Sequence, residues 1–297
     1  MSLLVLSLCL LSADTARHVE IRTAPGEVLN VVVQGEGPGA PVVMIPGLFG
    51  SAYGFRKVIP LLTARGFRTI VVEPLGIGDS GRPIPADYSL TAQADRVAAV
   101  LDTLATGPAI IVAHSTGASI AYRLAYRHPE LVRSIVSIEG GPTERAASAA
   151  FGRAMRFAPL IEHLGGVELL RYQLYHQLKQ ASGDASWVTD SVIQGYTAGA
   201  AADLGATLRA YRAMAASREP DSLRPHLADI ACPVVLLLGG AHHQGGPQPP
   251  ELTLLRHSLR SFAVDSVPGA GHYIFEEQPR AVLDAVLDVA GRAHASP

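Results

Sequence analysis

The feature that most constrains the fold is an alternation of short apolar runs with longer helical stretches. Runs such as 41–45, 109–112 and 234–238 are almost wholly apolar, which is typical of strands buried on both faces of a sheet. Segments with helical periodicity stand between them, for example at 90–104 and 117–127. Strands that alternate with helices of about 10 to 15 residues imply βαβ units. The sequence therefore predicts an α/β fold with a mostly parallel central sheet flanked by helices.

One long segment interrupts this alternation. Residues 143–222 show helical periodicity without a convincing strand, and apolar side chains recur there at three- and four-residue spacings. Binding sites of open α/β sheets lie at the carboxyl ends of the strands, and an insertion between two buried strands would cover that edge. We therefore expect an inserted helical cap at 143–222 and a core made of 17–142 and 223–297, with most of the apolar stripe sealed against the core.

Composition excludes several classes of protein. Of the 297 residues, 48% are hydrophobic and 17% are charged, which rules out a disordered chain. The net charge is −2 and no run of Lys or Arg occurs, so no nucleic-acid partner is expected. The two cysteines, Cys9 and Cys232, are too few for a disulfide scaffold or a cysteine-based zinc site.

The amino terminus carries a short apolar run that begins at Leu3 and ends at Leu11, with small residues after it, as in a secretory signal peptide. No Lys or Arg precedes the run. Residues 1–16 are therefore either a signal peptide or an N-terminal extension. The protein is correspondingly either exported or cytoplasmic, and both alternatives stay open. No segment reaches about 18 uninterrupted apolar residues, so no transmembrane segment is expected.

The strongest chemical signal is a serine between a strand and a helix. An apolar strand is expected to end before Ser115, and helical periodicity starts at once after it. Ala113 and Gly117 stand two residues to either side, and small residues are needed where a sharp turn brings two backbones together. Such a turn exposes the serine Oγ at the top of the sheet. The segment resembles the nucleophile elbow of the α/β-hydrolase fold, with Ala113 in place of the first glycine.

A serine at its ordinary pKa is a poor nucleophile and needs a histidine base. The resemblance implies that this base lies in a loop after the last strand, and of the eleven histidines only His272 has that setting. His114 adjoins Ser115, but neighbouring side chains of such a turn point different ways, so we expect His114 to be a packing residue. His242 and His243 have no third ligand at a metal-binding spacing, so we expect a solvated loop there and no metal site.

The resemblance also implies an oxyanion hole. Pro46, Gly47 and Leu48 follow the buried run at 41–45, where the family has a His-Gly loop, and Pro46 replaces the histidine. The backbone N–H groups of Leu48 and of Thr116, the residue after the serine, would be the two donors.

The triad acid is where this sequence departs from the family. Most members carry an aspartate just after the strand that follows the cap. Here His242 or His243 stands at that place, and a neutral imidazole cannot stabilise the imidazolium that forms at the base. We expect Glu139 instead, which ends the preceding apolar strand, although a salt-bridged or solvated strand end is the alternative. Asp265, seven residues before the histidine, is a weaker candidate.

The resemblance implies a lid-bearing serine esterase or lipase-like enzyme without cofactor or metal, acting on apolar small-molecule esters. Ser115 would form an acyl-enzyme, with His272 as base and Glu139 as acid. A serine nucleophile argues against epoxide hydrolase and dehalogenase chemistry, which in this fold resembles aspartate-nucleophile enzymes. Two alternatives stay open: a non-catalytic or weakly catalytic ligand-binding or signalling homologue, and an acyltransferase or perhydrolase that uses the same Ser-His site.

Overall fold

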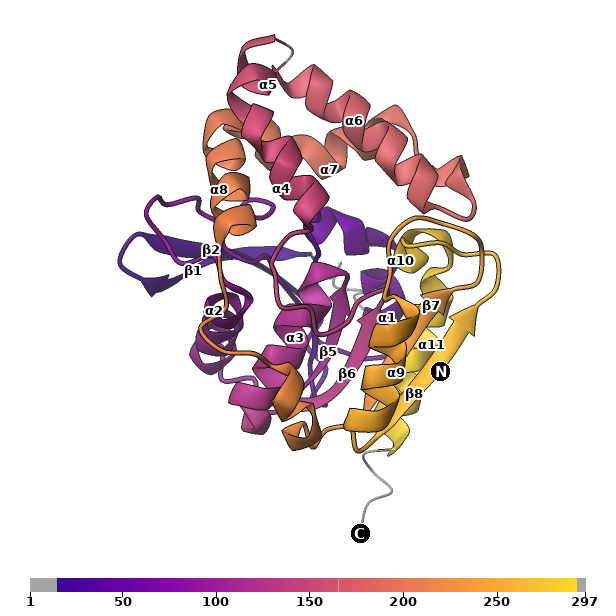
Figure 1. Ribbon diagram of the computed structural model, residues 1–297. Helices are drawn as coiled ribbons and strands as arrows, with labels where there is room; N and C mark the ends of the chain where they lie inside the picture. The colour runs from indigo at the N-terminus through magenta and orange to yellow at the C-terminus, as the bar shows by residue number, and fades with distance from the viewer. Residues whose placement is uncertain (1–14, 165, 293–297) are drawn as a thin grey trace, which may run out of the picture.

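The structure, a computed structural model, describes residues 15–164 and 166–292. An eight-stranded sheet forms its centre and is flanked by helices (Figure 1). The apolar run from Leu3 to Leu11, and with it the choice between signal peptide and extension, lies outside the described residues. Within the described ranges, no helix combines the length and the apolar character that crossing a bilayer would need.

The sheet has the order β1-β2-β4-β3-β5-β6-β7-β8. Its first strand pairs antiparallel with the second and the second with β4, whereas all the other neighbours run parallel. This confirms the predicted mostly parallel sheet. The strands are β1 (Arg17–Ala24), β2 (Glu27–Gln34), β3 (Val42–Ile45), β4 (Thr69–Val72), β5 (Ala109–His114), β6 (Val132–Ile138), β7 (Val234–Gly239) and β8 (Phe262–Val267).

Side-chain alternation along the central strands fills two apolar layers. In β3, Val43 and Ile45 pack with one cluster and Val42 and Met44 with the other, and all four are fully buried. The helices α2, α3 and α9 contribute to the first layer, and α1 and α11 contribute to the second. The helices outside the insertion are η1 (Ala52–Lys57), α1 (Ile59–Thr63), α2 (Leu90–Thr103), α3 (Thr116–Arg127), η2 (Pro129–Leu131), η5 (Arg224–Asp229), α9 (Pro249–Ser258), α10 (Ile274–Glu277) and α11 (Pro279–Arg292).

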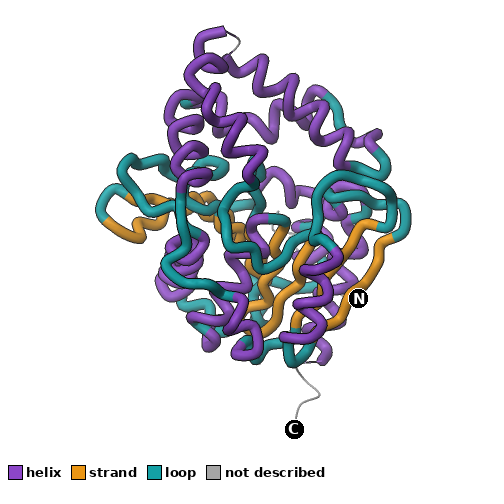
Figure 2. The backbone as a smooth tube through the Cα atoms, viewed as in Figure 1, coloured by secondary structure: helices purple, strands orange, loops and turns teal. Residues whose placement is uncertain are grey.

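The long connection between β6 and β7 carries further helices, which gather at one end of the sheet (Figure 1). Figure 2 shows this part as helices and loops, above the strands. We call these helices the cap helices. They are α4 (Ala149–Ala154), η3 (Met155–Phe157), α5 (Ala158–Leu164), α6 (Gly166–Ala181), η4 (Ala185–Trp187), α7 (Asp190–Ala202) and α8 (Leu204–Ala216).

The apolar stripe of the insertion is only partly sealed against the core. Leu174 and Leu178 of α6 are buried, as expected. Phe157 and Leu160, however, are 62% and 53% exposed. The reason is that Phe157 lies in η3 and Leu160 in α5, and both elements pack mainly on other cap helices and not on the sheet.

Candidate active site

The turn at Ser115 joins β5 to α3 in a conformation that side-chain-bearing residues rarely adopt. Its φ is 52° and its ψ is −119°. The Ser115 N–H donates to the carbonyl of Ile138 at 2.9 Å, which ties the turn to β6. A Cβ added at Gly117 would lie 2.4 Å from the Ile45 oxygen, and one added at Gly47 would lie 3.1 Å from Cβ of Ser115. Backbone crowding therefore requires small residues around the serine.

Glu139 follows β6 directly and also has a positive φ, 51°. Its side chain is buried, and the N–H of Gly239 donates to its Oε1. Its other oxygen, Oε2, lies 3.5 Å from Nδ1 of His272 and 3.0 Å from Nε2 of His243. The structure therefore brings Glu139 and His272 together and adds a second histidine to the pair.

Two opposing effects set the charge of Glu139. Burial alone raises the pKa of its carboxyl group. The neighbouring His272 imidazole and the hydrogen bonds from the Gly239 N–H and from Nε2 of His243 act the other way and prevail, so that the pKa of the carboxyl group lies below its ordinary value. The carboxylate is therefore charged at neutral pH, which is the state that can stabilise an imidazolium.

Only one of the two histidines in the loop after β7 is exposed to solvent. This corrects the expectation that the whole loop is solvated. His242 is exposed, but the side chain of His243 is only 10% exposed. Its Nδ1 lies 2.7 Å from the carbonyl of Ala241, and its Nε2 contacts the Glu139 carboxylate. Both partners are acceptors, so the two contacts together need a proton on each ring nitrogen. Burial lowers the pKa of His243, but these hydrogen bonds outweigh burial and raise it above its ordinary value.

Two glycines of the same loop lie directly against the Glu139 carboxylate and the His272 imidazole. A Cβ added at Gly246 would lie 2.2 Å from Oε2 of Glu139, and one added at Gly245 would lie 2.8 Å from Nδ1 of His272. Both glycines have positive φ angles, 76° and 105°. The sequence signal that could have indicated this contact is the Gly-Gly pair shortly after the two histidines.

The backbone of His272 is held from two sides. Nε2 of the buried His114 donates to the carbonyl of His272 at 3.1 Å, and the two rings lie 4.6 Å apart. Burial and the neighbouring His272 hold the pKa of His114 well below its usual value, so it stays neutral. On the other side, the N–H of His272 donates at 2.7 Å to the carbonyl of Ala181, the last residue of α6. His114 is thus a positioning residue as well as a packing residue, and a cap helix touches the histidine loop.

The two expected oxyanion donors lie close to each other. Leu48 and Thr116 both line one small cavity next to Gly47. The N–H of Thr116 stands at the first position of α3, where the helix itself offers no acceptor.

Ser115, Thr116 and Glu139 line a larger hollow of about 810 Å³. Much of the rest of its lining is polar, although the sequence led us to expect apolar substrates. The polar residues are Ser119, Thr143, Glu144, Arg145, Ser148, Arg224, Gln248 and Glu251.

Asp265, the weaker candidate for the acid, lies exposed on β8 and does not join the Glu139 cluster. The cluster itself has a metal-like composition, since Glu139, His243 and His272 offer three ligand atoms within 4.8 Å of one another. Sequence spacing does not indicate this third ligand. Two imidazoles and a carboxylate could hold a divalent cation. Oε2 of Glu139 already accepts a hydrogen bond from Nε2 of His243, and Nδ1 of His272 lies 3.5 Å from the same oxygen.

The sequence model of the alpha/beta hydrolase fold matches residues 40–279. The chain belongs to the alpha/beta hydrolase fold family. This hydrolase is 30% identical over 269 residues to 2-(acetamidomethylene)succinate hydrolase of Mesorhizobium japonicum, with 88% of this chain and 90% of the relative covered.

Other relatives agree with this membership. The hydrolase is 25% identical over 272 residues to the mouse sn-1-specific diacylglycerol lipase ABHD11, with 86% of this chain and 82% of the relative covered. The crystal structure of Cfl2 from Burkholderia cenocepacia superposes with a TM-score of 0.73 at 26% identity, covering 92% of this chain and 95% of that one.

Proposed function

We propose that the protein is a serine hydrolase that cleaves carboxylic esters of small molecules through an acyl-enzyme. The observation that carries the proposal is the Glu139 carboxylate 3.5 Å from Nδ1 of His272, together with Ser115, which stands on a strained turn and lines the same hollow as Glu139. A carboxylate at that nitrogen fixes the tautomer of the histidine that leaves Nε2 free to act on the serine.

The reaction then runs in two halves. Ser115 attacks the acyl carbonyl while Nε2 of His272 takes its proton and passes it to the leaving alcohol. Water, activated by the same histidine, hydrolyses the acyl-enzyme. The N–H groups of Leu48 and Thr116 would stabilise the oxyanion, each by about 3 kcal/mol in the transition state.

The rival functions differ in what they need from this site. A weakly catalytic binding protein was favoured by the missing aspartate, but Glu139 beside His272 supports a competent triad. The relative named a diacylglycerol lipase supports an ester substrate. An acyltransferase or perhydrolase would use the same Ser115 and His272 with an acceptor other than water.

Covalent labelling tests the proposal. A fluorophosphonate probe should label the wild-type protein at Ser115, as read by intact mass and peptide mapping, and should not label Ser115→Ala. A panel of p-nitrophenyl esters of increasing acyl length then gives the substrate range, and product analysis separates hydrolysis from acyl transfer. A wild-type protein that neither takes the label nor turns over any ester of the panel would refute the proposal.

A further inference from the structure

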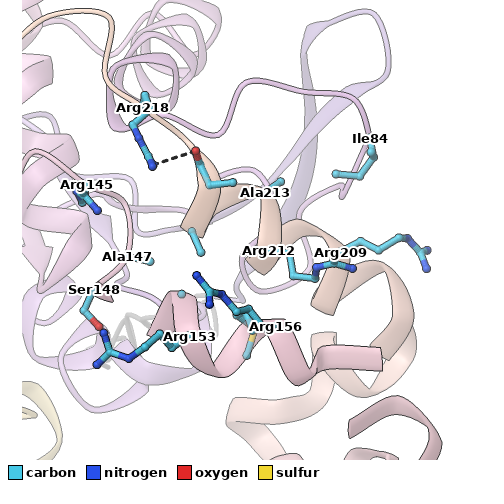
Figure 3. A pocket seen from close by; sticks show the side chains of 14 residues that line it. Ile84, Arg145, Ala147, Ser148, Arg153, Arg156, Arg209, Arg212, Ala213 and Arg218 are labelled. Carbon is cyan, nitrogen blue, oxygen red and sulfur yellow. Dashed lines mark hydrogen bonds between the residues drawn. The ribbon is translucent and has the colours of Figure 1, made fainter. Parts of the chain in front are cut away.

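A second hollow, of about 800 Å³, is lined by six arginines and by no acidic residue (Figure 3). We call it the arginine hollow. It lies where α4 and η3 pack against α8. The six residues are Arg145, Arg153, Arg156, Arg209, Arg212 and Arg218.

The fold gathers these charges from separate parts of the chain. Arg153 and Arg156 are three residues apart across α4 and η3, and Arg209 and Arg212 are three apart on α8. Residues at that spacing share one side of a helix, so two facing helices each present a pair. The chain as a whole has a net charge of −2. Its sequence contains no basic run that would predict this concentration of positive charge.

The arginines of the hollow are not held in ion pairs with any residue that the structure describes. Among the described residues, none of the six forms an ion pair, whereas Arg56, Arg96 and Arg123 elsewhere do. Arg218 donates only to backbone carbonyls. Like charges held around one concavity repel each other and attract anions into it, and the guanidinium fork matches carboxylate and phosphate groups.

The arginine hollow adjoins the hollow at Ser115. Arg145, Ala147 and Ser148 line both of them. Each hollow has the volume of a small-molecule site, about 300 to 1,000 Å³. A ligand that fills both would therefore place one end among the arginines and the other end near the serine.

We propose that the arginine hollow binds an anionic end of the substrate, a carboxylate or a phosphate group, while the ester reaches Ser115. The proposal rests on the ester hydrolase function proposed above and names its substrate class. Ala147 lines both hollows and offers an apolar contact to the carbon chain that links the two ends.

Matched substrates test the proposal through selectivity. The substrates are mono-p-nitrophenyl esters of dicarboxylic acids and p-nitrophenyl esters of monocarboxylic acids of equal chain length. We expect the double variant Arg156→Glu/Arg212→Glu to lower the ratio of kcat/KM values, anionic over neutral, by about tenfold or more. Arg280→Glu on α11 makes the same kind of charge reversal outside the hollow and should leave the ratio unchanged. An equal ratio in wild type, double variant and control would overturn the proposal.

Equilibrium binding separates this proposal from the ester hydrolase function. Citrate should bind saturably to Ser115→Ala protein at low ionic strength by calorimetry, and about tenfold more weakly after Arg156→Glu/Arg212→Glu. If citrate binding is weakened by the double variant but the wild-type protein turns over no ester, the anion site is supported and the hydrolase function is refuted. Ester turnover without charge preference or citrate binding would overturn the anion site alone. Binding to phosphatidylglycerol vesicles but not to citrate would also overturn it.

Discussion

Oε2 of Glu139 lies 3.5 Å from Nδ1 of His272, so the carboxylate at the histidine comes from the end of β6. The place after β7, where most of the family carries its aspartate, supplies His243 instead, which contacts the same carboxylate oxygen at 3.0 Å. The carboxylate therefore has two imidazole partners, one of which is not needed by the proposed mechanism.

Ser115→Ala should remove nearly all ester hydrolysis. The nucleophile and its base act as a unit, and loss of the serine in subtilisin lowers kcat by a factor on the order of 10⁶. Steady-state turnover of a p-nitrophenyl ester measures the effect, and circular dichroism checks the fold. Retention of more than a few per cent of the activity would mean that Ser115 is not the nucleophile.

His243→Gln should lower stability more at pH 6 than at pH 9. The pKa of folded His243 lies above its ordinary value of 6.5, so its ion pair with Glu139 contributes fully below that value. The contribution is lost as the pH rises through the folded pKa. Glu139 stays ionised throughout, because its own pKa is lowered.

Thermal unfolding of wild type and His243→Gln at the two pH values measures this difference. We expect the variant to be less stable than wild type by about 1 kcal/mol at pH 6 and by less at pH 9. A gap that is the same at both pH values would show that His243 is not charged in the folded protein.

Gly246→Ala should impair catalysis through Glu139. The new methyl group would lie 2.2 Å from Oε2 and push the carboxylate away from His272. A displacement on this scale can lower kcat by up to about 100-fold. Gly26→Ala is the matched control, because Gly26 has a similar φ of 79° but nothing within 4 Å of its added Cβ. If both variants kept wild-type kcat, the loop would not hold the carboxylate in place.

Dialysis against EDTA should leave ester hydrolysis unchanged. Oε2 of Glu139 is already engaged, because it accepts a hydrogen bond from Nε2 of His243 and lies 3.5 Å from Nδ1 of His272. Metal analysis of the purified protein and activity before and after chelation measure this. Loss of activity on chelation that is restored by a divalent cation would show that the three groups hold a metal.

The layered fold could be predicted from sequence because strands that are buried on both faces are apolar along their whole length. The runs at 41–45 and 109–112 lack the alternation of a half-exposed strand, and they became β3 and β5. Ser115 was also predictable, because its small neighbours at Ala113 and Gly117 are adjacent in sequence.

The rest of the site depends on contacts that sequence spacing does not encode. His243 meets Glu139 across 104 residues, and Gly246 covers the same carboxylate from that distant loop. The arginine hollow likewise joins Arg153 to Arg212 only after α4 packs on α8. Periodicity showed that these segments are helical, but it did not show which helix faces would meet.

Glu139→Gln is the most direct test of the proposed site, because it keeps the shape of the side chain and removes its charge. With the charge gone, the imidazolium of His272 loses its stabilising partner, and we expect kcat to fall by about 10⁴ with little change in KM. Asp265→Asn, which removes an exposed carboxylate on β8, should have little effect and serves as the control. A Glu139→Gln protein that is folded and stays within tenfold of wild-type kcat, or a greater loss in Asp265→Asn, would contradict the assignment of Glu139 as the triad acid.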